Sequence, residues 1–554
     1  MHNTPPIPAS RIRARLLATC LPLASLLLGL IFFFHPMIAS GFRRVPTDAG
    51  DPRLNAYFLE HLWKCLSGAP GKRSLWNPGC GYPAKNIFAY SDTLMSFEPL
   101  YAPWRALGLS PFSAFQAWLM AVAALNFAVF YAFLRWFLGY RVVACSLGAG
   151  LFAFAFPRLA QLGHAQLLPQ FYIVILLWAV WAFARSAPDD DASRRKRSCL
   201  IALACSMLVA QFYGGFYLAY FSAILLLFAM PWALALGFAR PMLRLLREQW
   251  FVLVLCLVLS AAALWPLVSR YLWVAAQLHD EGRGPESALS LLPRPASFFY
   301  MTGWSVFYGW MDRLTVFREL PNPSEQAYGL GFLTTAIVLW MLWQRHKQPG
   351  VRLAFLIAAT AFVLFVSFPF ELRLWNVAYH VLPGIKAMRA IARIGLLGLI
   401  PAAIALAAFV HVGMEKRSTR FVVILIALLC CLEQLGSAPG FKKVKVYARS
   451  QALALQVDPQ ADAFLYAPTA APEDWTLQQL DAMWAQQISG VRTVNVYSGS
   501  LPPGYPFRDG WKKGQPANLA RVQQALRDWL KADPEDQPRI QVITKSASQT
   551  SGSQ

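Results

Sequence analysis

Eleven long apolar runs constrain the fold of this 554-residue chain more than any other feature of its sequence. The hydrocarbon core of a membrane is about 30 Å thick, so a helix needs roughly 20 apolar residues to cross it with every backbone polar group paired. Aromatic residues are interleaved with Leu, Val and Ala without strict alternation, which favours helices over a β-barrel. The sequence therefore predicts an all-α polytopic membrane protein with about eleven spans. The runs lie near residues 17–38, 112–134, 142–157, 165–184, 199–214, 216–238, 250–269, 327–344, 353–370, 391–411 and 421–438.

The short basic loops between the runs predict the orientation, because such loops stay in the cytoplasm. Threading eleven spans in order puts the main basic clusters on one face, at 11–15, 135–141, 194–197, 240–247, 345–352 and 416–420. The N-terminus is then cytoplasmic and the C-terminus periplasmic, in a bacterial inner membrane. The run at 142–157 is short and ends at Pro157; without it, every later loop would change sides.

The formal charge of +22 comes from 50 Lys and Arg against 28 Asp and Glu. Much of the excess lies in membrane-flanking loops, so we assign it to topology and anionic lipid and not to nucleic acid. The sequence contains no zinc-type Cys/His cluster, Walker loop, dinucleotide-binding glycine motif or nucleophile elbow. It therefore indicates no metal site and no cofactor, and it leaves a requirement for a divalent cation open.

Four exported segments follow from this topology, namely 39–111, 270–326, 371–390 and 439–554. The first three belong to a transmembrane domain of residues 1–438. The last becomes polar and alternates between strand-like and helix-like stretches, which are Ala463–Tyr466, Leu477–Ile488, Thr493–Tyr497, Leu519–Lys531 and Ile540–Thr544. We expect a small periplasmic α/β domain at 439–545 and a disordered tail at 546–554.

A helix is expected to begin in the first exported segment, at Asp51. Asp51 precedes Pro52, which matches an N-cap residue followed by proline at the first helical position. An apolar stripe at helical spacing follows, formed by Leu54, Tyr57, Phe58 and Leu62. We expect this amphipathic helix to lie along the membrane interface.

Two of the nine cysteines, Cys65 and Cys80, share the first exported segment. In an oxidising periplasm, a bridge between them would close a short loop and stabilise the fold by about 3 kcal/mol. We therefore take this pair as a candidate disulfide, an inference that rests on compartment and loop length.

Acidic residues are sparse within the runs and common in the exported segments. This distribution argues against an ion-coupled transporter and favours a reaction at the outer membrane surface. Asp48 and Asp51 emerge soon after the first run, at the height of a lipid-linked phosphate. A carboxylate there can act as a general base that takes a proton from an acceptor hydroxyl. Asp51 is the preferred base and Asp48 the fallback; the alternative is that Asp51 only caps its helix.

Basic residues at membrane exits break the orientation rule and therefore invite a functional interpretation. Arg389 and Arg393 are four residues apart, which predicts one face of a helix that enters the tenth span. Their guanidinium groups could hold a phosphate and balance the charge of a leaving group. Arg43, Arg44 and Lys386 could add to the same site. The alternative for Arg389 and Arg393 is binding to lipid headgroups.

Four further residues are secondary candidates. His164 lies at the outer end between the third and fourth runs, where a lone histidine is more often structural than a base. Asp92 and Glu98 could bind sugar hydroxyls or a divalent ion, although no metal-ligand spacing supports them and a solvated loop face is the alternative. Glu325 is the last acidic residue of the second exported segment.

The pattern resembles the C-type (GT-C) superfamily of membrane glycosyltransferases, which use polyprenyl-phosphate sugars. The resemblance rests on the first span followed by Thr47–Asn55, the long first exported loop, the many spans and the exported C-terminal region. The chain also resembles a largely uncharacterised group of bacterial membrane proteins within or near that superfamily, in the stretches Tyr90–Leu94, Pro157–Gln166, Leu382–Arg393 and Asn495–Gly499.

The superfamily implies an exported aspartate as base, inverting transfer of a sugar from a polyprenyl phosphate, and basic residues near the lipid phosphate. Asp51 would be that base here, although the chain lacks the Asp-Glu doublet of better-known members. The leading hypothesis is a glycosyltransferase with a lipid-linked sugar as donor and a periplasmic glycan, lipid or protein as acceptor. The alternatives are a lipid-linked glycan flippase or transporter, and a non-catalytic subunit of an envelope-polysaccharide assembly complex.

Overall fold

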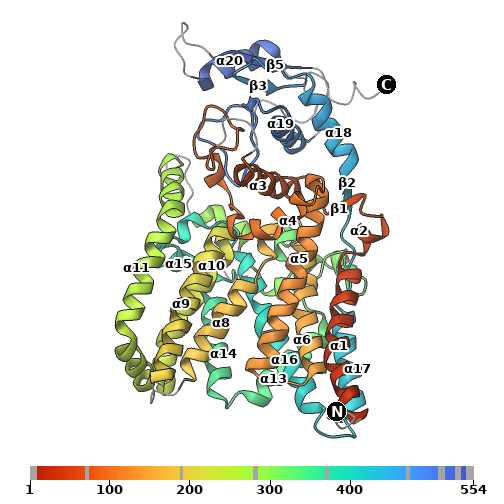
Figure 1. The fold of residues 1–554 in the computed structure, drawn as a ribbon, viewed down its shortest axis with the longest axis vertical. Helices are drawn as coiled ribbons and strands as arrows, with labels where there is room; N and C mark the ends of the chain where they lie inside the picture. Colours follow the sequence, from red (N-terminus) through yellow and green to blue (C-terminus); the bar gives the residue numbers. More distant parts are fainter. Residues whose placement is uncertain are drawn as a thin grey trace, which may run out of the picture.

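The computed structural model describes residues 9–68, 74–186, 191–278, 285–368, 374–468, 474–508, 518–530 and 538–544. A bundle of long helices forms one part, and the C-terminal segment covers one end of it (Figure 1). Helix α1 (Ala9–Phe33) begins at the opposite end of the bundle. The expected tail at 546–554 falls outside the described residues.

The helices of the bundle follow the apolar runs, and each predicted run overlaps one of them. They are α1 (Ala9–Phe33), α5 (Pro111–Ala132), α6 (Val142–Phe154), α8 (Phe171–Ala184), α9 (Asp191–Gly214), α10 (Phe216–Ala233), α11 (Ala239–Gln277), α13 (Phe332–Arg345), α14 (Pro349–Phe365), α16 (Leu399–Gly413) and α17 (Arg420–Leu432).

Seven helical segments in the described part of the chain are long and apolar enough to cross a membrane. Shorter apolar helices occupy Ala18–Phe33, Pro349–Phe365 and Arg420–Leu432. The chain is therefore a mostly helical, multi-pass membrane protein, and the number of eleven spans stays a prediction.

Short helices and strands at the covered end connect the bundle to the C-terminal segment. The helices are α2 (His35–Ala39), α3 (Asp51–Leu66), α4 (Ala102–Ala106), α7 (Phe156–Ala160), α12 (Thr315–Arg318) and α15 (Trp375–Val381). Strand β1 (Arg44–Pro46) pairs antiparallel with β2 (Gly440–Lys442), with Val45 opposite Phe441. The chain just after α1 is thereby joined to the chain just after α17.

The C-terminal segment contains a small parallel sheet with three helices. Its strands are β3 (Ala463–Tyr466), β4 (Arg492–Thr493) and β5 (Ile540–Ile543), in the order β4-β3-β5. The helices are α18 (Lys443–Ala454), α19 (Trp475–Ser489) and α20 (Leu519–Leu530). Asp474 caps α19, because its side chain accepts a hydrogen bond from the backbone N–H of Thr476.

Helix α3 lies across the end of the bundle, beneath α19 (Figure 1). Every residue from Pro52 to Leu62 is buried. On the side of α19, Arg53 forms an ion pair of 2.7 Å with Asp481, and the Tyr57 hydroxyl donates to Oε1 of Gln486 at 2.8 Å. Helix α3 is therefore covered by protein along this stretch, and its expected place along the membrane interface stays a prediction. A segment more than 400 residues later in the sequence covers its polar face.

The segment after α6 is irregular where the sequence predicts the outer end of the third span. Ala155 is extended, and a new helix, α7, starts with Pro157 in its first turn. The buried Arg158 guanidinium donates to the carbonyl oxygens of Phe152 and Leu168 and to Oε1 of Gln170. These bonds satisfy carbonyls left open by the break and fix the segment that carries His164.

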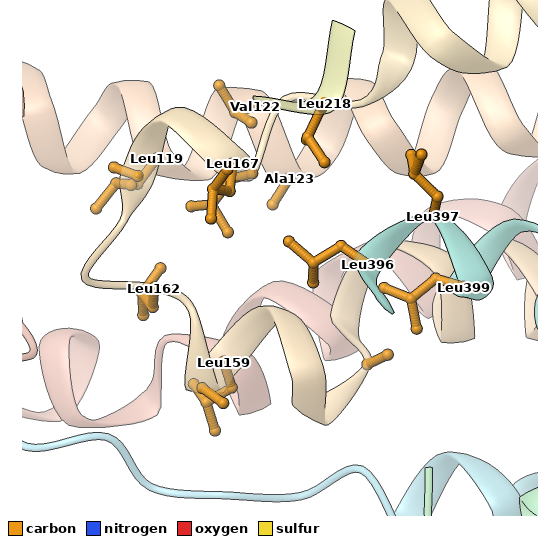
Figure 2. Close-up of a cluster of buried hydrophobic side chains, with 14 of the residues drawn as sticks. Leu119, Val122, Ala123, Leu159, Leu162, Leu167, Leu218, Leu396, Leu397 and Leu399 are labelled. Atoms are coloured by element: carbon orange, nitrogen blue, oxygen red, sulfur yellow. The ribbon is translucent and has the colours of Figure 1, made fainter. Parts of the chain in front are cut away.

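Apolar packing holds this segment on its other sides. Figure 2 shows leucines of α5, of residues 159–167, of α10 and of the 3-10 segment η12 (Ile391–Gly398) gathered in one cluster. Leu162 and Leu167, on either side of His164, are both buried in it. Truncating such a buried leucine typically costs about 2–5 kcal/mol, so the cluster strongly restrains the position of His164.

Candidate active site

Asp51 is the first residue of α3, and its carboxylate does not cap the helix. Gly50 occupies the N-cap position, where no side chain bonds to the helix N-terminus. Asp48 Oδ1 accepts a hydrogen bond from the N–H of Gly50 at 2.7 Å, while Asp48 itself remains exposed. The alternative that Asp51 serves only as a cap is therefore wrong, and its side chain is available for other contacts.

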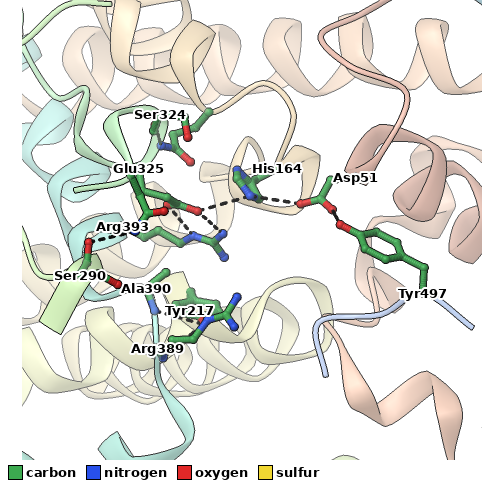
Figure 3. A network of polar contacts seen from close by, with 12 residues as sticks. Asp51, His164, Tyr217, Ser290, Ser324, Glu325, Arg389, Ala390, Arg393 and Tyr497 are labelled. Atoms are coloured by element: carbon green, nitrogen blue, oxygen red, sulfur yellow. Dashed lines mark hydrogen bonds and ion pairs between the residues drawn. The ribbon is translucent and has the colours of Figure 1, made fainter. Parts of the chain in front are cut away.

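Both oxygens of Asp51 have partners from distant parts of the chain (Figure 3). Nε2 of His164 lies 3.1 Å from Oδ2, and the Tyr497 hydroxyl donates to Oδ1 at 2.6 Å. The side chain of Asp51 has a relative solvent-accessible surface of 31%, so a ligand can still reach it.

His164 connects Asp51 to a second carboxylate. Its Nε2 lies 3.4 Å from Oε1 of Glu325, which belongs to the 3-10 segment η10 (Pro323–Gln326). Because Nε2 faces two carboxylate oxygens, it carries the proton. Arg393, in η12, donates to Glu325 through Nη2 at 2.7 Å and through Nε at 3.2 Å. Asp51, His164, Glu325, Arg393 and Tyr497 are called the Asp51 cluster below.

The electrostatics of the cluster keep both carboxylates charged. Burial raises the pKa of Asp51, but hydrogen bonds from His164 and Tyr497 and the charge of Arg393 outweigh it and lower that pKa to about 2. Burial likewise raises the pKa of Glu325, and the charges of Arg393 and His164 bring it down to about 2. Burial and the Asp51 charge raise the pKa of Tyr497, so Tyr497 keeps its proton and donates.

The two arginines expected on one helix face are separated in the structure. Arg393 is buried, with its guanidinium 4.7 Å from the ring centre of Tyr217. Arg389 is exposed and precedes η12, where the backbone at Met388 is extended. The N–H groups of Arg389 and Ala390 contact the Tyr217 hydroxyl at 3.4 Å. The expectation of a shared helix face is wrong, because the chain enters the tenth run through irregular backbone.

The other basic candidates lie on exposed surface. The Lys386 ammonium is 5.7 Å from the ring centre of Tyr379. Lys386 is close in sequence to Arg389. Arg44 pairs with Lys442 in the β1–β2 ladder, and Arg43 contributes its carbonyl to the N–H of Lys443. Within the described ranges, no hydrogen bond or ion pair joins Arg43 or Arg44 to the Asp51 cluster.

Asp92 and Glu98 are buried, so the alternative of a solvated loop face is wrong for both. Asp92 Oδ1 accepts from the N–H of Phe216 at 2.7 Å, at the start of α10. Burial raises its pKa above the ordinary value. Glu98 is 3% exposed, and burial together with the nearby charge of Glu60 raises its pKa to about 9. Glu98 is therefore neutral near pH 7 and does not act as a charged ligand.

The structure does not join Cys65 to Cys80. Cys80 is buried beside Tyr57, and burial raises the pKa of its thiol to about 12. Cys65 contacts His61, with 3.7 Å between Sγ and Nε2. Tyr57 and Cys65 are eight residues apart on α3, roughly 12 Å along the axis, which is too far for a disulfide from Cys80. The expected Cys65–Cys80 disulfide is therefore wrong.

Within the described residues, no group of three or more His, Cys, Asp or Glu side chains could hold a metal ion. The negative charges of Asp51 and Glu325 are met by Arg393, His164 and Tyr497. Sequence reasoning missed Tyr497 and Tyr217 as parts of the site. The stretch Asn495–Gly499, which carries part of the family resemblance, was the available signal for Tyr497.

No protein-family model and no curated protein matches the sequence. Solved structures match its fold. The apo oligosaccharyltransferase of Archaeoglobus fulgidus superposes with a TM-score of 0.52 at 14% identity, over 90% of this chain and 65% of that chain. The chain has a GT-C fold. It spans less than two thirds of the length of the archaeal enzyme.

Two further solved structures are similar to this chain with lower TM-scores. The archaeal oligosaccharyltransferase AglB from Archaeoglobus fulgidus, in complex with an inhibitory peptide and a dolichol-phosphate, gives a TM-score of 0.46 at 12% identity, over 92% of this chain and 68% of that chain. ArnT from Cupriavidus metallidurans gives 0.40 at 14% identity, over 86% of this chain and 85% of that chain. At 14% identity, the similarity to the apo archaeal enzyme concerns the fold alone.

Proposed function

We propose that this chain is a membrane glycosyltransferase that moves a sugar from a polyprenyl-phosphate donor to a periplasmic glycan, lipid or protein. The observation that carries the proposal is the Asp51 cluster. It holds an ionised, partly exposed carboxylate at the end of the helical bundle, beneath the C-terminal segment. A GT-C fold around that carboxylate supports a sugar transfer from a lipid carrier over the other functions considered.

In the proposed reaction, the acceptor hydroxyl attacks the anomeric carbon of the donor sugar while the bond to the polyprenyl phosphate breaks. Asp51 takes the proton of the hydroxyl. A carboxylate whose pKa is about 2 is a weak base. It accepts the proton late, after the acceptor oxygen has bonded to carbon and become acidic. His164 and Tyr497 fix the direction of the carboxylate and leave its remaining lone pairs for the acceptor.

The departing phosphate requires positive charge that is not already neutralised. Arg393 is bonded to Glu325 through two nitrogens, so its main role is to hold Glu325 and, through it, His164. Arg389 is exposed and lies four residues earlier, beside Tyr217. We therefore assign the phosphate contact to Arg389, with Lys386 as a second cation, and give Arg393 a positioning role.

The proposal places the protein in a bacterial inner membrane, with its N-terminus in the cytoplasm and the Asp51 cluster on the periplasmic side. The basic loops of the sequence support this orientation. Helix α3, whose first residue is Asp51, lies at the end of the bundle opposite the start of α1 (Figure 1). Residues 439–545 would form the periplasmic domain above it.

The test is transfer of labelled sugar by membrane vesicles that contain the full chain. A panel of polyprenyl-phosphate hexoses and pentoses, labelled in the sugar, is presented with envelope extract as acceptor. Asp51→Asn should reduce transfer at least 100-fold, since general-base catalysis contributes about 10²–10⁴-fold. Asp48→Asn is the matched control and should retain activity. Full transfer by Asp51→Asn would refute the assignment, and flux of lipid-linked glycan without a new glycosidic bond would indicate a flippase.

A further inference from the structure

A group of basic side chains lies where the chain passes from the bundle into the C-terminal segment. In the β1–β2 ladder, Arg44 lies directly opposite Lys442. Arg43 immediately precedes β1, and Lys445 lies in the first turn of α18. All four side chains are exposed. They are called the basic patch below.

The ladder turns two of these charges to the same side. Directly opposite residues of an antiparallel pair share a face, and successive residues alternate between faces. Val45 is fully buried, and the ring of its partner Phe441 packs edge-on against Phe112 of α5. The other face, with Arg44 and Lys442, therefore points away from the protein. Like charges directly opposite each other destabilise a ladder, so a bound anion would relieve this pair.

The protein itself does not supply that anion. Within the described residues, the side chains of Arg44 and Lys442 have no ion pair and no hydrogen bond. The acidic residues nearest to them in sequence have other partners. Asp48 accepts from the N–H of Gly50, and Glu433 accepts from N–H groups at the start of α13. The patch therefore keeps its positive charge, on the side of the membrane where basic residues are normally sparse in the proposed orientation.

Helix α5 holds the ladder at the level where a span begins. The Gln116 amide donates to the carbonyl oxygens of Phe42 at 3.1 Å and of Arg44 at 2.7 Å. Its own oxygen accepts from the Lys443 ammonium at 2.8 Å. Gln116 lies early in the helical segment Pro111–Phe137, which is long and apolar enough to cross a membrane. The patch is therefore fixed at the height of lipid headgroups.

The bundle next to the patch presents an apolar surface. Ile31 and Phe32 are exposed near the end of α1, and Leu429 and Leu432 are exposed near the end of α17. Both helices pack against α6, and both lead into the ladder at the covered end of the bundle (Figure 1). Acyl chains can lie along these side chains while a phosphate lies at the patch. This combination fits a phospholipid better than a soluble anion.

We propose that the basic patch binds the phosphate of an anionic phospholipid, in the leaflet at the covered end of the bundle. The Arg44 guanidinium can donate two parallel hydrogen bonds to phosphate oxygens, and Lys442 adds a point charge. The bound lipid ties the C-terminal segment to the membrane surface through β2. The site is separate from the phosphate contact assigned to Arg389, and the inference does not depend on the proposed function.

The test is binding of phosphatidylglycerol, fluorescently labelled on an acyl chain, to the purified full chain in an uncharged detergent. Arg44→Gln combined with Lys442→Gln should weaken binding at least about tenfold, because each cation near an anionic lipid is worth about fivefold in binding. Without the lipid, this variant should melt at the same temperature as the wild type or higher, since the opposed like charges are gone. Arg521→Gln combined with Arg527→Gln, at exposed positions of α20, removes the same charge and should bind as the wild type does.

Competition identifies the ligand. Unlabelled phosphatidylglycerol should displace the label, whereas phosphatidylcholine or inorganic phosphate at the same concentration should not. Equal binding by the Arg44 and Lys442 double variant, or the same loss in the α20 variant, would overturn the proposal. Displacement by inorganic phosphate would also overturn it, because the site would then recognise a soluble anion. Asp51→Asn should lose sugar transfer and keep lipid binding, so the two proposals fail independently.

Discussion

Two side chains remote in sequence hold Asp51 in place. His164 lies 113 positions later in the chain, and Tyr497 belongs to the C-terminal segment. The sequence indicated Asp51 because an aspartate before a proline follows the first apolar run. It could not indicate the partners, since Glu325 and Arg393 are 68 residues apart and meet only through tertiary folding. The sequence also could not predict that Arg389 and Arg393 lie apart, because a spacing of four residues is compatible with one face of a helix.

Removing the hydroxyl of Tyr497 should weaken the proposed reaction. Tyr497→Phe takes one donor from Asp51, so the pKa of Asp51 rises from about 2 toward its ordinary value and the carboxylate loses an orientation restraint. The higher basicity of Asp51 alone would favour proton transfer, but the loss of alignment outweighs it, because a misplacement of about 1 Å can cost about 10²-fold in rate. Transfer should therefore fall about tenfold or more. The sugar-transfer assay in vesicles measures this. Tyr300→Phe, which breaks another Tyr–Asp bond at Asp312, is the control and should stay active.

Glu98 should make stability depend on pH. Its pKa is raised from 4.5 to about 9, so the folded chain binds a proton that the unfolded chain releases, and stability falls as pH rises from about 4.5 to 9. Glu98→Gln should remove this pH-dependent loss of stability, because the amide does not titrate. The variant should melt at least about 2–4 °C above the wild type at pH 8 and gain less at pH 5. An equal gain at both pH values, or the same pH-dependent gain in the exposed control Glu415→Gln, would contradict this account.

At the scale of elements, α3 shows what local sequence can and cannot predict. Its start was predicted to within one residue, because the N-cap is Gly50 and not Asp51, and the predicted apolar stripe lies on this helix and is buried. The helix that covers its polar face could not be predicted, because α19 is remote in sequence. The strand-like stretches at Ala463–Tyr466 and Ile540–Thr544 did coincide with β3 and β5, since each is a short apolar segment between polar ones.

The contact between α3 and α19 depends on a buried ion pair. Arg53 and Asp481 are each 1% exposed, and Arg449 adds a second contact to Asp481 at 2.7 Å. Asp481→Ala leaves the Arg53 charge buried without its carboxylate, which typically costs about 3–5 kcal/mol. Melting of the purified variant should therefore occur several degrees lower. Asp528→Ala, at an exposed position of α20, should melt as the wild type does. A similar shift in both variants would argue against a special role for the Arg53–Asp481 pair.

At the scale of the whole molecule, apolar runs and basic loops predicted the helical bundle well, because length and hydrophobicity in a membrane decide where helices form. They did not predict that α6 ends at Phe154 and that α7 follows an extended residue. That break depends on Arg158, whose bonds to Phe152 and Leu168 are tertiary. The same break puts His164 beside Asp51.

The predicted orientation has a direct test in fusions of reporter enzymes. With eleven spans and a cytoplasmic N-terminus, alkaline phosphatase fused after Gln554 should be active and green fluorescent protein there should be dark. Fusions in the basic loop at 416–420 should give the opposite result. Active phosphatase at 416–420 would show that the count or the orientation is wrong.

The most direct test of a shared site for donor and base is a cryo-EM structure of the full chain with a polyprenyl phosphate bound. The phosphate should lie next to Arg389, on the side from which a donor sugar reaches the exposed edge of Asp51. Asp51 should still bond to His164 and Tyr497. A phosphate bound about 20 Å or more from Asp51, or at the cytoplasmic end of the bundle, would contradict a shared site for donor and base.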